Sequence, residues 1–168
     1  MLSLPHSSNP SLLPPLGDLR HLQRLSVILN GGGSVPEPDF DAPLFAGITH
    51  LEIITNKNSW TTWSPYWSHR LPALTHLALG FKGDARAANI NSFQYGPPSL
   101  KVFAILAHND FVSRASLYLV RENFDDPRVV VMPEGEHTQN WLHGLRGESD
   151  MWAFAEAMVV VQSDDTSS

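Results

Sequence analysis

Histidine and acidic residues after two predicted strands are the residues of this sequence that could most readily do chemistry. His108 and Asp110 follow the hydrophobic segment 102–106, and Glu134 and His137 follow the segment 129–132. Catalytic groups collect at the carboxyl ends of strands in open parallel sheets, so His108, Asp110 and His137 could serve an α/β hydrolase or transferase. The sequence has no Gly-x-Ser-x-Gly motif, no Walker-type phosphate loop and no His-Glu-x-x-His motif. Because position in a fold is weak evidence for chemistry, we favour a non-catalytic protein and keep the enzyme as the alternative.

His50 and His76 are the second set of residues with possible chemistry, because both lie at the same place in a repeated segment. A pair of imidazoles could begin a metal site, but zinc needs three or four protein donors. The residues at the same spacing on either side are Arg24 and Val102, and neither is a ligand. We therefore expect no metal site and no cofactor.

The interval between these histidines extends through much of the sequence. The hexamer 74–79, Leu-Thr-His-Leu-Ala-Leu, closely matches 48–53, Ile-Thr-His-Leu-Glu-Ile, 26 residues earlier. A period of roughly 20–29 residues with a Leu-x-x-Leu-x-Leu core is typical of leucine-rich solenoids. The pattern predicts an α/β fold: a leucine-rich-repeat-like solenoid of about five 26-residue strand–loop–helix units with one parallel sheet. Its central positions are Leu25, Leu51, Leu77, Phe103 and Val129.

Composition divides the chain into four segments. Residues 1–15, rich in Ser and Pro, read as a flexible lead-in, and 16–134 as the solenoid. Residues 135–162 form a loop and a capping helix with Trp152, Ala155, Met158 and Val159 at helical spacing on one face. The polar residues 163–168 are expected to be a disordered tail.

The residues between the core leucines would form the open face of the sheet, where a solenoid binds its partner. Its first half is polar and its second half apolar, and an apolar patch indicates either a partner site or an internal cover. Strands that are apolar on both faces are also typical of a sheet with helices on both sides. We slightly favour cover by Trp141 or Trp152, which would leave only the polar half to bind. The candidate partner-binding residues are Arg24, His50, Glu52 and His76 in the polar half and Leu106, Val130 and Met132 in the apolar half.

Charge and composition limit the partners. A net charge of −6 without a basic stripe argues against nucleic acid. The chain has no cysteine, no apolar run long enough to span a membrane and no signal peptide pattern. We expect an intracellular protein, cytoplasmic or nuclear, whose partner is another protein.

Three segments together carry a resemblance to a known family: 71–79 (LPALTHLAL), 97–103 (PPSLKVF) and 150–153 (DMWA). They resemble the leucine-rich C-terminal halves of F-box proteins from mushroom-type fungi. This resemblance implies substrate recognition for a cullin-type ubiquitin ligase. Residues 1–16 contain no F-box-like helical segment, so adaptor binding is not expected of this chain.

Overall fold

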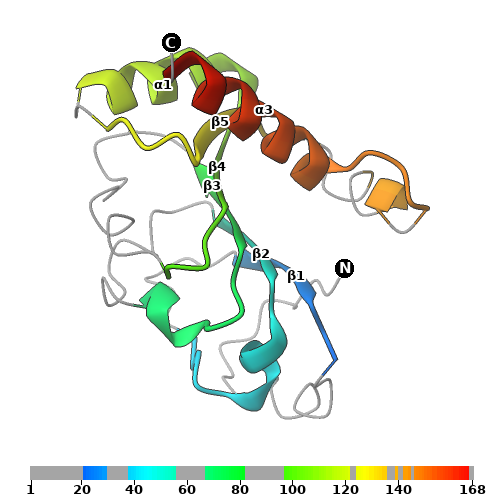
Figure 1. Ribbon diagram of the computed structural model, residues 1–168. Coiled ribbons are helices and arrows are strands. Elements are labelled where there is room, and N and C mark those ends of the chain that lie inside the picture. Colours follow the sequence, from blue (N-terminus) through cyan, green and yellow to red (C-terminus); the bar gives the residue numbers. More distant parts are fainter. Residues whose placement is uncertain are drawn as a thin grey trace.

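Five strands form a single parallel sheet in the order β1-β2-β3-β4-β5 (Figure 1). The computed structural model describes residues 21–29, 38–55, 67–81, 97–121, 124–135, 139, 142–144 and 146–166. The strands are β1 (Arg24–Leu29), β2 (His50–Thr55), β3 (His76–Phe81), β4 (Val102–Ala107) and β5 (Val129–Pro133). The helix α1 (Val112–Arg121) joins β4 to β5, and α3 (Met151–Thr166) follows β5. Short 3-10 helices span Pro43–Gly47, Trp67–Arg70 and Asn109–Phe111.

The pairing register has the same interval as the sequence repeat. Leu25 pairs with Leu51, Leu51 with Leu77, Leu77 with Phe103 and Phe103 with Val129. Successive side chains of a strand point to opposite faces, so this register places equivalent leucines in one row. The prediction of one parallel sheet in sequence order, followed by a C-terminal helix, is therefore confirmed.

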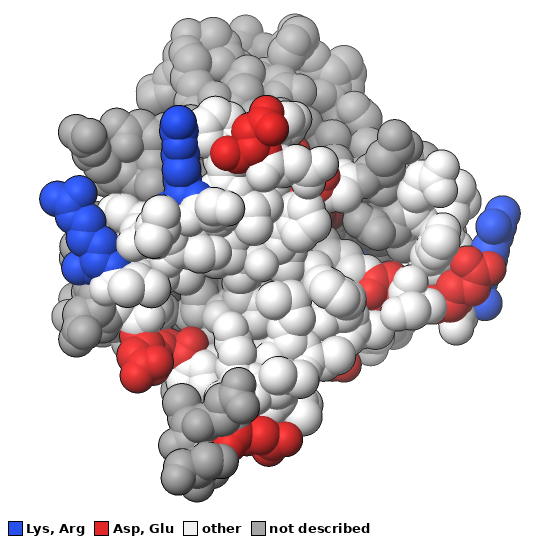
Figure 2. Space-filling view, turned by 90° about the horizontal axis from the view of Figure 1, so that it is seen from above, with Lys and Arg blue, Asp and Glu red and all other residues white. Residues whose placement is uncertain are grey.

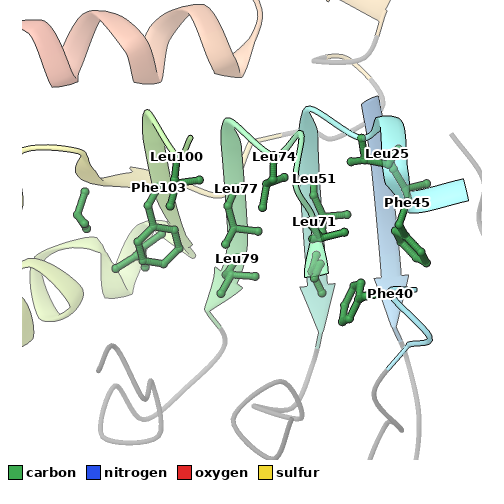
Figure 3. Close-up of a cluster of buried hydrophobic side chains, with 14 of the residues drawn as sticks. Leu25, Phe40, Phe45, Leu51, Leu71, Leu74, Leu77, Leu79, Leu100 and Phe103 are labelled. Atoms are coloured by element: carbon green, nitrogen blue, oxygen red, sulfur yellow. The ribbon is translucent and has the colours of Figure 1, made fainter. Parts of the chain in front are cut away.

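The row of leucines forms the main core on one face of the sheet (Figure 3). Leu51, Leu77 and Phe103 are buried there beside residues of the connections. Phe45 lies between β1 and β2, Leu71 and Leu74 between β2 and β3, Leu100 before β4 and Ala115 on α1. The described parts of all four connections thus pack against the same face.

The helix α3 packs against the opposite face of the sheet, over β4 and β5 (Figure 1). Trp152 and Ala155 of α3 contact a second buried cluster from the strands. Every residue of β4 is buried, because α1 covers one face at this end and α3 covers the other. The strand residues of this cluster are Ala78, Val102, Ala104, Leu106, Val130 and Met132.

The last helix is longer than the sequence indicated. It continues through Thr166, so residues 163–166, expected in a disordered tail, form its final turn. Ser163 Oγ donates a hydrogen bond to the carbonyl of Val159, one turn earlier, at 2.8 Å, as serines inside helices commonly do. Residues 1–15, Trp141 and His137 lie outside the described residues.

Candidate partner-binding site

The apolar half of the predicted binding face is core. Leu106 and Val130 have 0% of their surface exposed and Met132 has 4%, because α3 lies over them. Trp152, itself 9% exposed, is the large side chain that closes this cluster. The assignment of Leu106, Val130 and Met132 as partner-binding residues is therefore corrected: in this chain, they bind α3.

The polar half is organised around two stacked histidines. The rings of His50 and His76 lie parallel, with centroids 4.1 Å apart and an interplanar angle of 4°. Each histidine ring also makes a T-shaped contact with the ring of Trp152. The ring centroids are 5.3 Å apart for His50 and 5.6 Å apart for His76. The repeat places the histidines in adjacent strands, and Trp152, near the start of α3, packs against both rings.

The threonine before each histidine orients its ring. Thr49 Oγ1 donates to the carbonyl of Gln23 at 3.1 Å, and Thr75 Oγ1 donates to the carbonyl of Thr49 at 3.1 Å. Each hydroxyl also lies within hydrogen-bond distance of the following histidine's Nδ1, at 2.9 Å for His50 and 2.8 Å for His76, and the tautomer of the ring decides which atom donates. The repeated Thr-His pair thus joins neighbouring strands and holds the Nδ1 side of both rings.

His76 also contacts α3 directly. Its Nε2 lies 2.9 Å from Oε1 of Glu156, which requires a proton on one of these two atoms. Burial lowers the pKa of His76, and the hydrogen bond to Glu156 opposes that shift. Protonation of His76 is therefore tied to the position of α3.

Burial also dominates the electrostatics of His50. It lowers the pKa of His50 from the ordinary value of 6.5 to about 4, and the nearby charges of His76 and Arg24 act in the same direction. Both rings are thus favoured in the neutral form at pH 7. A stacked neutral pair fits a structural role, since two imidazolium rings at this distance would repel.

Two further contacts complete the polar half. Arg24 Nη1 donates to Asp150 Oδ2 at 2.7 Å, while Asp150 Oδ1 accepts from the backbone N–H groups of Trp152 and Ala153 at the start of α3. Ser26 Oγ donates to Glu52 Oε2 at 2.6 Å, and both residues are buried. Arg24, with 45% of its side chain exposed, and the half-buried His50 are the more accessible of the four polar candidates. Much of the polar half therefore serves to hold α3.

The residues of the enzyme alternative do not form a shielded site among the residues that the structure places. His108 Nδ1 lies 3.5 Å from Asp110 Oδ2, and the two side chains are 61% and 82% exposed. His137 is outside the described residues, so its position relative to this pair is not defined. Within the described ranges, no group of three or more histidine or acidic residues could hold a metal ion. None of the helices described there is long and apolar enough to cross a membrane.

Sequence reasoning missed an exposed apolar surface on the two helices. α3 turns Phe154 (54% exposed), Val160 (59%) and Val161 (62%) outward, and α1 does the same with Leu117 (67%) and Val120 (76%). We call these five residues the helical end surface, because both helices lie at the β5 end of the sheet (Figure 1). Viewed from that side, the molecule shows a broad region without charged side chains, with basic and acidic groups towards its edge (Figure 2).

The signal for this surface was present in the sequence of α3. The residues that face the sheet, Trp152, Ala155, Met158 and Val159, account for only part of the apolar residues of α3. Phe154, Ala157 and Val161 follow the same helical spacing on another side. A helix that is apolar all round is normally buried all round, so this second stripe indicated a second contact.

Comparisons with known proteins returned no match to a protein-family model, a curated protein or a solved structure.

Proposed function

We propose that this chain is a non-catalytic protein-binding module whose partner docks on the helical end surface. The observation that carries the proposal is that three apolar side chains of α3, Phe154, Val160 and Val161, are each more than half exposed. Exposed apolar side chains that gather on one surface mark interaction sites, whereas scattered ones need no explanation. Aromatic anchors such as Phe154 are enriched in protein interfaces.

The arrangement of the strands supports this role. We interpret the constant 26-residue register and the one-sided connections as a leucine-rich-repeat-like solenoid. The terminal unit of such a stack normally presents a polar outer face to water. Here the last helix also exposes Phe154, Val160 and Val161, which favours a surface that is covered when the protein acts.

This proposal moves the binding site away from the open face of the sheet. Solenoids commonly bind through that face, but α3 occupies its apolar half in this chain. The resemblance to F-box receptors would make the bound protein a substrate of a ubiquitin ligase. That wider role remains part of the proposal.

Site-specific photo-crosslinking tests the docking surface. A photoreactive phenylalanine analogue is placed at Phe154 or Val160, with Lys101, an exposed residue before β4, as the control position. Irradiation in the cells that express the protein should give protein adducts at positions 154 and 160 and none at 101. Absence of adducts across the helical end surface would contradict the proposed function.

A further inference from the structure

Two large apolar side chains of α1, Leu117 and Val120, face solvent. They are 67% and 76% exposed, which is more than any other large apolar side chain in the described part of the chain. The other side of α1 packs on the main core through the buried Ala115, on the face of the sheet opposite α3. The exposed side of α1 is therefore a surface separate from that of α3.

The residues on this side have the spacing of a coiled-coil seam. Ser113, Leu117 and Val120 follow one another at intervals of four and three residues, which is the interval of the a and d positions of a heptad. Ser113 is exposed as well, so the seam runs along the solvent side of the helix. Such a seam packs against the apolar side of a second amphipathic helix.

Two arginines line one edge of this seam. Arg114 and Arg121 are two helical turns apart and hold the same heptad position, which directly follows a seam position. Both are exposed, and α1 contains no acidic residue. Among the residues that the structure describes, no carboxylate lies within ion-pair distance of either guanidinium. Arg114 lies over the ring of Phe111 instead, 5.3 Å from its centroid. The edge is thus positively charged and available to an anionic group.

We propose that the exposed side of α1 binds an acidic amphipathic helix of a partner protein. The partner helix places apolar residues against Leu117 and Val120 and carboxylates beside Arg114 and Arg121. Charged residues that flank the seam of a coiled coil select the partner and its orientation, and complementary charges do the same in other interfaces. The inference rests on the proposed protein-binding function and specifies the chemistry of the partner at α1.

An anionic membrane is the other ligand that a basic and apolar helix face can recognise. Helices that bind in this way normally insert a broad apolar face with Trp, Phe or Leu, whereas the seam of α1 exposes only Leu117 and Val120 as large apolar residues. The chain also has a net charge of −6, which anionic lipids repel. A protein helix therefore fits this surface better than a membrane does.

A designed fluorescent peptide tests the inference by fluorescence anisotropy with the full chain. The acidic probe has three heptads with Leu at positions a and d and Glu at positions e and g, so that its own charges oppose self-association. A neutral probe has Gln in place of each Glu. We expect the acidic probe to bind the unaltered chain about fivefold more tightly than the neutral probe, because only the acidic probe pairs with the arginines.

Charge reversal identifies the residues that bind the probe. R114E/R121E should weaken binding of the acidic probe by about tenfold or more. Val120→Asp should weaken binding of both probes, because it places a charge in the apolar seam. All three positions are exposed, so the fold should be retained, which circular dichroism can verify.

A matched control makes the same change of net charge elsewhere. K101E/R146E alters two exposed basic residues outside α1 and should leave the affinity for the acidic probe unchanged. A third probe with Lys at positions e and g should bind R114E/R121E more tightly than K101E/R146E. Because these two variants have equal net charge, this difference reports the position of the charges and not their number.

The outcomes separate this inference from the proposed function. Equal affinity of the unaltered chain for the acidic and neutral probes, or binding of neither, would overturn the inference. Binding to phosphatidylserine vesicles that R114E/R121E abolishes, without binding of the acidic probe, would assign α1 to a membrane instead. If the acidic probe fails while position 154 or 160 crosslinks to a protein, the partner chemistry at α1 is wrong and the proposed function stands. If the probe binds through the two arginines and neither position gives adducts, the α1 site stands and docking on α3 is wrong.

Discussion

Individual polar residues on the open face of the sheet act together as an anchor for α3. His50 and His76 stack on each other and against Trp152, while Glu156 and Asp150 of α3 bond to His76 and Arg24. The two threonines that precede the histidines contact Nδ1 of each ring. Residues that looked like a binding site in the sequence thus have an internal partner.

His50 makes the folding stability depend on pH. Its folded-state pKa of about 4 lies below the ordinary 6.5, so the unfolded chain takes up this proton first as the pH falls. Stability should be fully present above pH 6.5 and should decrease as the pH falls from there to about 4. His76, whose pKa is also lowered, contributes in the same direction.

Urea unfolding of the unaltered chain and His50→Gln measures this effect. The difference in unfolding free energy between neutral and mildly acidic solution should be smaller in the variant, because one of the two imidazoles with a lowered pKa is gone. His76 should leave part of the pH dependence in place. Equal pH dependence in the two proteins would contradict the assignment of His50.

Glu156 controls the titration of His76. Its carboxylate stabilises the protonated ring, so Glu156→Gln should lower the pKa of His76 further. The glutamine side chain can still hydrogen-bond to Nε2 of the neutral ring, through its amide oxygen or its amide nitrogen, and α3 should remain docked. NMR titration of the His76 ring measures this pKa. Glu148→Gln is the matched control, because Glu148 contacts His143 instead, and it should leave the His76 titration unchanged.

Among the elements, α3 differs from an ordinary surface helix because two of its sides are apolar. One side is part of the fold, and Phe154, Val160 and Val161 lie exposed away from it. The two aromatic residues of α3 separate these roles: Trp152 is 9% exposed and Phe154 is 54% exposed.

Alanine substitution of these aromatic residues should therefore have unequal effects. Trp152→Ala should lower the unfolding free energy by about 3–5 kcal/mol, since it leaves a cavity between α3 and the sheet, beside the two histidine rings. Phe154→Ala should cost under about 1 kcal/mol, because the side chain is largely in water. Chemical denaturation at one fixed, low protein concentration compares the variants. Equal losses for the two variants would mean that α3 is not docked through Trp152.

In the whole molecule, one contact joins the first strand to the last helix. Arg24 on β1 and Asp150 before α3 are 126 residues apart in sequence and 2.7 Å apart in space. The Asp150 carboxylate also caps α3, because its Oδ1 accepts hydrogen bonds from the backbone N–H groups of Trp152 and Ala153. Its removal should therefore cost more than removal of the arginine.

Urea unfolding of three single variants separates these two tasks. Asp150→Ala should cost about 1–2 kcal/mol through the lost helix cap, whereas Arg24→Met should cost about 0–1 kcal/mol as a partly exposed ion pair. Asp150→Asn keeps an N-cap acceptor and should resemble Arg24→Met. If Asp150→Asn costs as much as Asp150→Ala, the ion pair and not the cap dominates.

The sequence by itself determined the sheet. The strands, their order and their register follow from leucines repeated at a constant interval, because a slip of one residue would turn Leu51 or Leu77 away from the core. It also indicated the start of the final helix and the buried role of Trp152. These features depend on patterns within one repeat or one helix, which periodicity can reveal.

Only the tertiary structure decided what the remaining side chains contact. α3 is apolar on more than one side, so its spacing could not show which side packs on the sheet and which is left exposed. The polar side chains of His76 and Glu52 likewise suggested a solvent-exposed surface, whereas both residues are buried in the folded chain. Leu117 and Val120 of α1 lie at the same end of the sheet as α3 only because both helices pack against β5, one on each face. The helical end surface thus combines residues distant in sequence, and no local pattern could have assembled it.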